Sequence, residues 1–107
     1  MSDLEIDLTL IGGSTVLVEM TGFRILTDPT FDPPSRYEVG GIVLEKTAGP
    51  ALTADQVGAS DLAQVSHDQH FDNLDRAGRM FLTRAKARCT TRAGATRLGQ
   101  GVTGLSP

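Results

Sequence analysis

The chain opens with a regular alternation of apolar and polar residues. Leucine or isoleucine occupies positions 4, 6, 8 and 10, and Glu5, Asp7 and Thr9 lie between them. This period of two is typical of a strand that buries one face. After Gly12-Gly13, the apolar and β-branched runs 15–20 and 23–27 flank the turn signal Thr21-Gly22. The pattern predicts a β-meander of three strands.

The next segment breaks this regularity. Asp28-Pro29 stops the third strand, and Pro33-Pro34 and Gly40-Gly41 predict irregular chain to about Gly49. A long loop inside a small domain is usually functional, and we expect it to form a wall over a site. Thr53 is a good N-cap residue for a short helix that runs to Val57.

In the second half, the pattern changes to an alternation of strands and helices. Residues 62–65 form an apolar run, and helical spacing then relates Leu74, Ala77, Phe81, Leu82 and Ala85. We expect a short strand at 88–91 and a short helix at 93–98 that Gly99 ends, with no closing element in 100–107. Strands first and alternating elements afterwards indicate an α/β or α+β layered fold, and we expect a single domain over 1–107.

Composition narrows the setting of this domain. The 107 residues are 39% hydrophobic and include one cysteine, Cys89, so no intramolecular disulfide is expected. The first residues carry no positive charge and no long apolar run, which predicts neither a signal peptide nor a membrane span. We therefore expect a soluble, cytoplasmic protein without a membrane partner.

Charge is distributed unevenly along the chain. All thirteen acidic residues lie at or before Asp75, and seven of the ten cationic residues follow it. A basic last third can bind nucleic acid. No stacking aromatics accompany these arginines, so a solvated helix face is the favoured interpretation, and nucleic acid is not an expected partner.

The densest chemistry lies between Val65 and Asp75, where the chain gathers both of its histidines and three carboxylates. Imidazole and carboxylate groups are ligands that suit Zn²⁺ and related ions. His67, His70 and Asp72 are the candidate ligands, and a bound ion would lower the pKa of its water toward neutrality. Asp68 or Asp72 would orient that water or take its proton.

A structural interpretation of the same residues stays open. Asp72 or Asn73 is a plausible helix N-cap, and Asp75 in the first turn would interact favourably with the helix dipole. The two histidines can simply be solvated. Asp28 likewise is either a site residue or the residue that ends a strand.

Three motifs in the same order carry a resemblance to a known family. They are Ile11-Gly12-Gly13-Ser14-Thr15-Val16-Leu17-Val18-Glu19, Ile25-Leu26-Thr27-Asp28-Pro29 and Ser66-His67-Asp68-Gln69-His70-Phe71-Asp72-Asn73-Leu74-Asp75. The chain resembles the metallo-β-lactamase-fold hydrolases, in the branch similar to L-ascorbate-6-phosphate lactonases. That branch has I-G-H-x-(T/S)-x-L-(I/V)-E, a strand that ends in D-P, and H-x-H-x-D-H followed by L-D.

The resemblance implies a ligand set and also shows departures from it. His67, His70, Asp72 and Asn73 match the ligand positions for Zn²⁺ or Mn²⁺, one or two ions. Gln69 widens the histidine spacing, Asn73 replaces the last histidine and Gly13 replaces that of the first motif. The second ion therefore lacks a full set of ligands.

The resemblance also implies a fold and a reaction. The family has an αββα sandwich of two similar halves, and this chain is similar to the N-terminal half, since no histidine or acidic residue follows Asp75. The implied reaction is attack of metal-bound hydroxide on an ester, lactone or phosphoester of a small molecule. The alternative is a non-catalytic, truncated α/β module. Because Leu4, Ile6, Leu8, Val16 and Val18 would leave an apolar face uncovered, a homo-oligomer is also expected.

Overall fold

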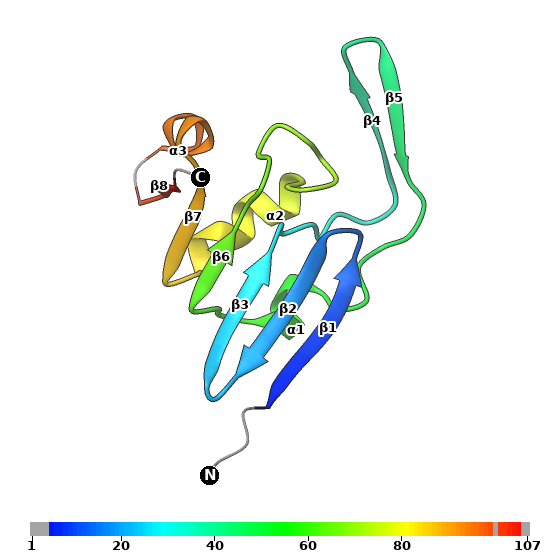
Figure 1. Cartoon of the computed structure of the whole chain (residues 1–107). Helices are drawn as coiled ribbons and strands as arrows, with labels where there is room; N and C mark the ends of the chain where they lie inside the picture. The colour runs from blue at the N-terminus through cyan, green and yellow to red at the C-terminus, as the bar shows by residue number, and fades with distance from the viewer. Residues whose placement is uncertain (1–4, 100, 106–107) are drawn as a thin grey trace.

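The computed structural model describes residues 5–99 and 101–105. Their elements, in chain order, are β1 (Ile6–Gly12), β2 (Thr15–Met20), β3 (Phe23–Thr27), β4 (Ser35–Val39), β5 (Ile42–Lys46), α1 (Ala54–Val57), β6 (Leu62–Gln64), α2 (Arg76–Phe81), the 3₁₀ helix η1 (Leu82–Arg84), β7 (Ala87–Thr91), α3 (Arg92–Leu98) and β8 (Thr103–Leu105). The fold is mixed α/β, as the sequence predicted (Figure 1).

Six of the strands form one sheet in the order β1-β2-β3-β6-β7-β8. The first three pair antiparallel, which confirms the meander, and β3, β6, β7 and β8 run parallel to one another. Each parallel neighbour is reached through helical chain, as parallel pairing requires. The carboxyl ends of β3, β6 and β7 therefore lie at the same edge of the sheet.

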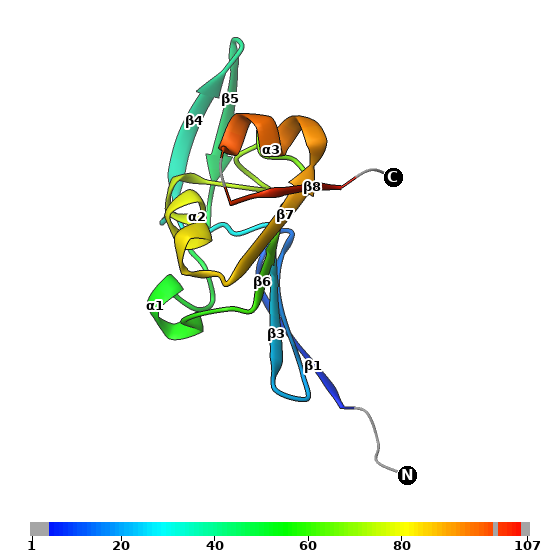
Figure 2. The same ribbon diagram turned by 90° about the vertical axis from the view of Figure 1, so that its left-hand side faces the viewer.

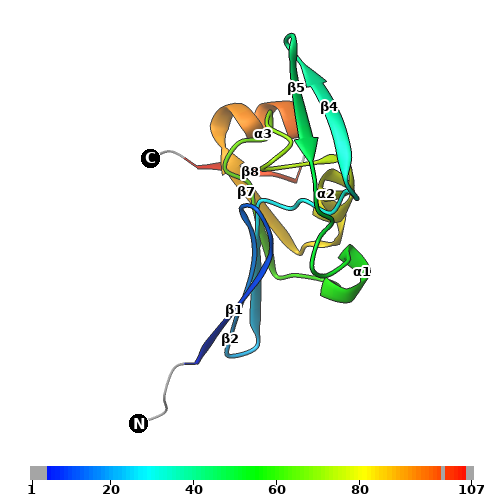
Figure 3. The same ribbon diagram turned by 90° about the vertical axis from the view of Figure 1, so that its right-hand side faces the viewer.

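The helices lie on one side of this sheet (Figures 2 and 3). Alternation places Leu17, Leu26 and Ala63 on the covered face, where they are almost fully buried. Phe81 of α2 and Val57 of α1 share a cluster with Leu17 and Leu26, whereas Ala63 packs in a second cluster with Leu74 and Leu82. At Gly78 the approach is so close that an added Cβ would lie 1.8 Å from the carbonyl oxygen of Pro29. None of the described helices is long and apolar enough to cross a membrane.

The helix starts follow local capping rules. Thr53 forms a capping box with Gln56, as expected for the start of α1. The cap of α2 is Asp75, whose side chain accepts a hydrogen bond from the Gly78 N–H, so the suggestion of Asp72 or Asn73 as the N-cap was wrong. Asp75 is preferred because its backbone is extended and its carboxylate is fully buried against this turn.

Two segments that were expected to be irregular contain strands. Within 28–49, β4 and β5 form an antiparallel hairpin that projects from the molecule (Figure 1). Its turn is Gly40-Gly41, and both glycines have positive φ, 58° and 80°, as tight hairpin turns require. In the stretch expected to lack a closing element, β8 pairs parallel with β7.

The second face of the large sheet carries no helix, and we call it the open face. Register and alternation assign it Ile6, Leu8, Leu10, Val16, Val18, Met20, Phe23, Ile25, Thr27, Leu62, Gln64, Ala87, Cys89, Thr91, Thr103 and Leu105. None of these side chains is charged. Leu8 and Leu10 are 68% and 65% exposed. The expected apolar face is thus present, although Leu4 lies outside the described residues.

Candidate functional site

Residues 66–75, which we call the site loop, connect the carboxyl end of β6 to α2 (Figure 1). Because β3 runs parallel to β6, with Thr27 opposite Gln64, the residues that follow the two strands meet. Asp28 follows β3, and its φ is 41°, an unusual value that aspartate tolerates better than most residues. Loops at the carboxyl edge of parallel strands are a common place for ligand sites in α/β folds.

A hydrogen-bond network holds both ends of the site loop. The Asp28 carboxylate accepts from the backbone N–H of Ser66 at 2.6 Å and from its hydroxyl at 2.9 Å. The Asn73 amide donates to Asp28 at 3.2 Å and to the Ser14 hydroxyl at 3.3 Å. Ser14 in turn donates to the Asp72 carbonyl at 2.8 Å. Asp28 is therefore an anchor of the loop as well as the end of a strand.

The two histidines project from the loop that this network holds. The ring centroids of His67 and His70 are 5.6 Å apart and the rings are nearly perpendicular. The backbone N–H of His70 donates to the His67 carbonyl at 3.4 Å, which closes the turn between the two histidines. Both rings are exposed, and Nδ1 of His67 lies 3.2 Å from the Ser66 hydroxyl. The sequence prediction that these two residues lie close together agrees with this geometry.

The remaining candidate ligands do not join the histidine pair. Among residues 5–99 and 101–105, no three His, Cys, Asp or Glu side chains are placed to hold one metal ion. The expectation that His67, His70 and Asp72 converge is therefore corrected to a pair. Asp72 lines a cavity, and the amide nitrogen of Asn73 is hydrogen bonded within the network.

Asp68, the other candidate for proton transfer, is bound elsewhere. Its carboxylate is 3% exposed and accepts from Nε and Nη2 of Arg97 at 2.8 and 2.6 Å. The hydrogen bonds from the Arg97 guanidinium lower the pKa of Asp68 below its usual value. Asp68 thus ties the site loop to α3, and a proton-transfer role would require this ion pair to open.

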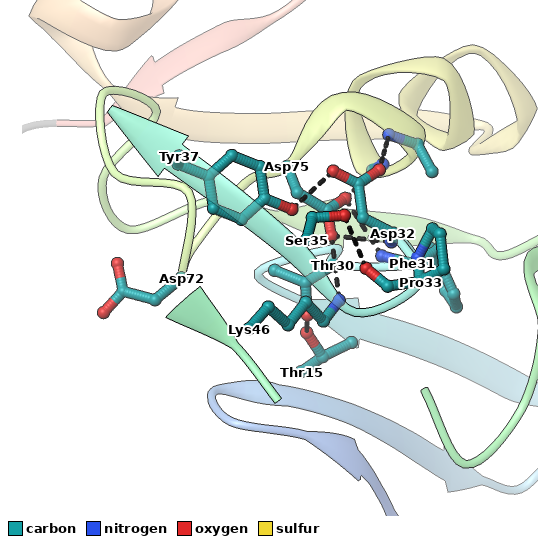
Figure 4. Close-up of polar contacts among 12 residues, drawn as sticks. Thr15, Thr30, Phe31, Asp32, Pro33, Ser35, Tyr37, Lys46, Asp72 and Asp75 are labelled. Atoms are coloured by element: carbon teal, nitrogen blue, oxygen red, sulfur yellow. Dashed lines mark hydrogen bonds and ion pairs between the residues drawn. The ribbon is translucent and has the colours of Figure 1, made fainter. Parts of the chain in front are cut away.

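A buried group of carboxylates was not expected from the sequence. Asp75 is fully buried and accepts from the N–H groups of Phe31, Asp32 and Gly78 at 2.7–2.9 Å and from the Lys46 ammonium at 3.1 Å (Figure 4). Asp32 accepts from the Tyr37 hydroxyl at 2.6 Å and from the Ala77 N–H at 2.8 Å. These contacts fasten the β4–β5 hairpin to the start of α2.

An aromatic stack extends this connection to the site loop. The rings of Tyr37 and Phe71 stack with centroids 4.3 Å apart and planes 13° from parallel. The Arg76 guanidinium lies over both rings, 5.2 Å from the centroid of Tyr37. The Gly-Gly turn between two short β-rich runs was the one sequence signal that could have located this hairpin.

The environment of Tyr37 predicts an unusual titration. Burial and the hydrogen bond to Asp32 raise the pKa of Tyr37 to about 12 from its ordinary value of 10.0. The neutral hydroxyl therefore stabilises the fold fully below pH 10, and this stabilisation is lost as the pH rises from 10 to 12. Tyr37 is the only tyrosine and there is no tryptophan, so absorbance near the phenolate band reports on it alone. Asp32→Asn should shift the midpoint of the Tyr37 absorbance titration toward pH 10. An unchanged midpoint would show that the hydrogen bond to Asp32 does not raise the pKa of Tyr37.

A cavity of about 370 Å³ lies beside the stack. Its walls come from the β1–β2 turn at Gly12-Gly13, Thr30, Tyr37, residues 44–50 and Phe71-Asp72. The cavity thus brings together three segments that are distant in sequence, and one of them is the site loop.

Comparison with known sequences found no family model and no curated protein that match this chain. Solved structures, however, share its fold. An isothiocyanate hydrolase from Delia radicum gut bacteria aligns with a TM-score of 0.67 and 19% identity, over 92% of this chain and 40% of that protein. A protein from Veillonella parvula DSM 2008, named for a proposed metal-dependent hydrolase activity, aligns with a TM-score of 0.67 and 16% identity, over 95% and 42%.

A third structure comes from Parabacteroides distasonis ATCC 8503 and is also named for a proposed metal-dependent hydrolase activity. It aligns with a TM-score of 0.58 and 15% identity. It is matched over 94% of this chain and 37% of its own length. The chain thus spans about two fifths of the length of these proteins, and identities this low show the fold alone. The described chain has the mixed α/β fold of one part of these three proteins.

Proposed function

We propose that this chain forms part of the active-site domain of a metal-dependent hydrolase. The observation that carries the proposal is the exposed His67–His70 pair on an anchored loop, at the carboxyl edge of parallel strands, in a fold shared with hydrolases. The implied substrate is a small ester, lactone or phosphoester, as the resemblance to lactonase-like proteins suggests. One or two Zn²⁺ or Mn²⁺ ions would supply hydroxide near neutral pH by lowering the pKa of bound water.

The fit between these residues and a metal ion is partial. His67 and His70 supply two imidazoles, and catalytic zinc sites commonly use three protein ligands. The Asp72 carboxylate and the Asn73 amide oxygen are the next candidates, although no third donor joins the pair in the described residues. Further ligands would have to come from outside them, from additional chain or from a partner.

The chain's own residues have definable tasks within this proposal. Asp28 and Ser66 fix the loop backbone, so the histidines start from a restricted set of positions. Asp72 is exposed at the cavity, where it can contact a bound substrate and accept a proton from it. Asp68 can do so only after leaving Arg97, so we assign it second to Asp72.

The alternative function is a non-catalytic α/β module. The incomplete ligand set favours it, because two imidazoles alone hold an ion weakly. In that case the ordered network at Asp28 only stabilises the loop, and the histidines are solvated.

Metal binding separates the two proposals. The chain has only two histidines, so Mn²⁺ added to the protein should broaden both pairs of imidazole proton signals in the NMR spectrum. With Zn²⁺ in calorimetry, His67→Ala and His70→Ala should each weaken binding by more than about tenfold, in line with the sensitivity of metal sites to their ligands and supports.

Gln69→Ala is the matched control, since Gln69 is exposed between the two histidines. It should leave the affinity unchanged. Equal Zn²⁺ binding by the wild type and by a His67→Ala/His70→Ala double variant would contradict the ligand assignment and favour the non-catalytic module.

A further inference from the structure

Three polar side chains in the walls of the cavity beside the Tyr37–Phe71 stack are hydrogen bonded to residues outside its lining. The Tyr37 hydroxyl donates to Asp32, and the Lys46 ammonium donates to Asp75. The hydroxyl of Thr30 is hydrogen bonded to that of Thr15. What these three residues offer to a ligand is therefore mainly their carbon atoms.

The other walls add to this apolar character. Leu44, Ala48 and Pro50 line the cavity, and the Tyr37 and Phe71 rings, stacked on one another, line it as well. Arg76 contacts both rings and Asp32 holds the Tyr37 hydroxyl, so these walls are ordered before any ligand arrives. Preorganised apolar walls with a few polar groups are typical of small-molecule sites.

The charge at the rim has one sign. Among the ion pairs of the described residues, none involves Asp72 or Glu45, both of which are exposed and line the cavity. Lys46 is the one cation of the lining, and Asp75 neutralises it at 3.1 Å. Two carboxylates that form no ion pair thus line the cavity, with Asp72 next in sequence to Phe71, whereas Arg36, opposite Glu45, and Arg76, over the two rings, are not part of the lining.

We propose that this cavity binds a small apolar molecule that carries an ammonium or other N–H donor group, and that it discriminates against anions. The apolar body lies against Tyr37 and Phe71, and the donor group forms a charge-assisted hydrogen bond with the Asp72 carboxylate. The identification of this ligand as the substrate rests on the proposed function. Of the three substrate classes proposed above, the phosphoester is the least favoured, because Asp72 and Glu45 would repel its phosphate.

Tyr37 makes the test direct. The chain has one tyrosine and no tryptophan, so Tyr37 dominates its intrinsic fluorescence. The probes are cyclohexylmethylammonium, cyclohexylmethanol and cyclohexanecarboxylate, which have the same ring and do not absorb at the exciting wavelength. We expect Tyr37 fluorescence to titrate with the ammonium at lowest concentration, then with the alcohol, and least with the carboxylate. The ammonium should exceed the alcohol in affinity by about tenfold, as a charge-assisted contact predicts.

Two variants test the site itself. Asp72→Asn should remove the advantage of the ammonium over the alcohol, whereas Asp55→Asn, the same charge change on α1 away from the cavity, should keep it. Gly12 lines the cavity, and an added Cβ there meets no atom within 4 Å, so a larger side chain has room to enter the cavity. Gly12→Leu should therefore abolish binding of all three probes. Carboxylate binding as tight as ammonium binding, or full binding by Gly12→Leu, would overturn the inference.

The same titration on the His67→Ala/His70→Ala variant separates this inference from the proposed function. Probe binding that persists while Zn²⁺ binding is lost supports both assignments. If wild-type protein binds the probes but no metal, the cavity inference stands and the hydrolase proposal fails. If the wild-type protein binds metal but binds all three probes with the same affinity, the hydrolase proposal stands and the cavity inference fails.

Discussion

Asp75→Ala is expected to destabilise the chain severely. This carboxylate is fully buried and receives three backbone N–H groups and the Lys46 ammonium. Alanine would leave the N–H groups of Phe31, Asp32 and Gly78 without their acceptor in a region closed to water. It would also remove the N-cap of α2 and leave Lys46 without its counterion.

The expected cost is about 3–5 kcal/mol, the usual result when one partner of a buried ion pair is removed. A domain of this size has a total stability of about 5–15 kcal/mol, so much of it would be lost. Urea unfolding followed by circular dichroism measures the change. Asp75→Asn, which keeps the shape and one acceptor oxygen, should lose less than Asp75→Ala.

Asp55→Ala provides the contrast. Asp55 also pairs with a cation, Arg84, but its side chain is 87% exposed, and exposed ion pairs add little stability. Its unfolding midpoint should match the wild type within error. Equal midpoints for Asp75→Ala and the wild type would show that the buried contacts of Asp75 do not hold the hairpin and α2 together.

The strands that the sequence predicted correctly are those with a recognisable period or an apolar, β-branched run. In β1 the alternation is clear because Ile6, Leu8 and Leu10 all lie on the open face and Asp7 and Thr9 on the other. In β5, Ile42, Val43 and Leu44 are all exposed, so no period of two marks that strand. The three residues of β8 include a glycine and are too few to show any period.

The site loop was located from the sequence because its chemistry is concentrated in adjacent residues. Its surroundings were not predictable, because they depend on contacts between distant segments. The hydrogen bond from the Phe31 N–H to Asp75 joins residues 44 positions apart, and that from Arg97 to Asp68 spans 29. The separation of Asp72 from the histidines is likewise a matter of side-chain direction, which residue spacing in a loop does not specify.

The open face bears on the behaviour of the chain in solution. It crosses six strands, a width of roughly 24 Å at the usual spacing of about 4.8 Å, and carries no charged side chain. Its area is on the order of several hundred Å², approaching the roughly 800 Å² per partner of a standard interface. Charged groups on a partner surface would lose their hydration at the open face without gaining an ion pair or a hydrogen bond in exchange. A surface that covers the open face must therefore also be apolar. In a preparation of this chain alone, the open face of a second copy is the surface that meets this condition.

We therefore expect the purified chain to form a dimer through its open face, seen as a concentration-dependent increase in sedimentation coefficient. Leu8→Lys with Leu10→Lys should shift the chain to monomer at concentrations where the wild type is dimeric, because two ammonium groups would be buried at the interface without counterions. Asp7→Lys is the control, since Asp7 lies on the same strand but on the opposite face, and it should leave the dimer intact.

The reactivity of Cys89 gives a second measurement of the same dimer. Cys89 lies on the open face, and burial raises the pKa of its thiol. It should therefore react more slowly with a thiol reagent in the dimer than in the double variant. A wild type that sediments as a monomer at all concentrations, with the same Cys89 reactivity as the double variant, would show that the face stays exposed to water.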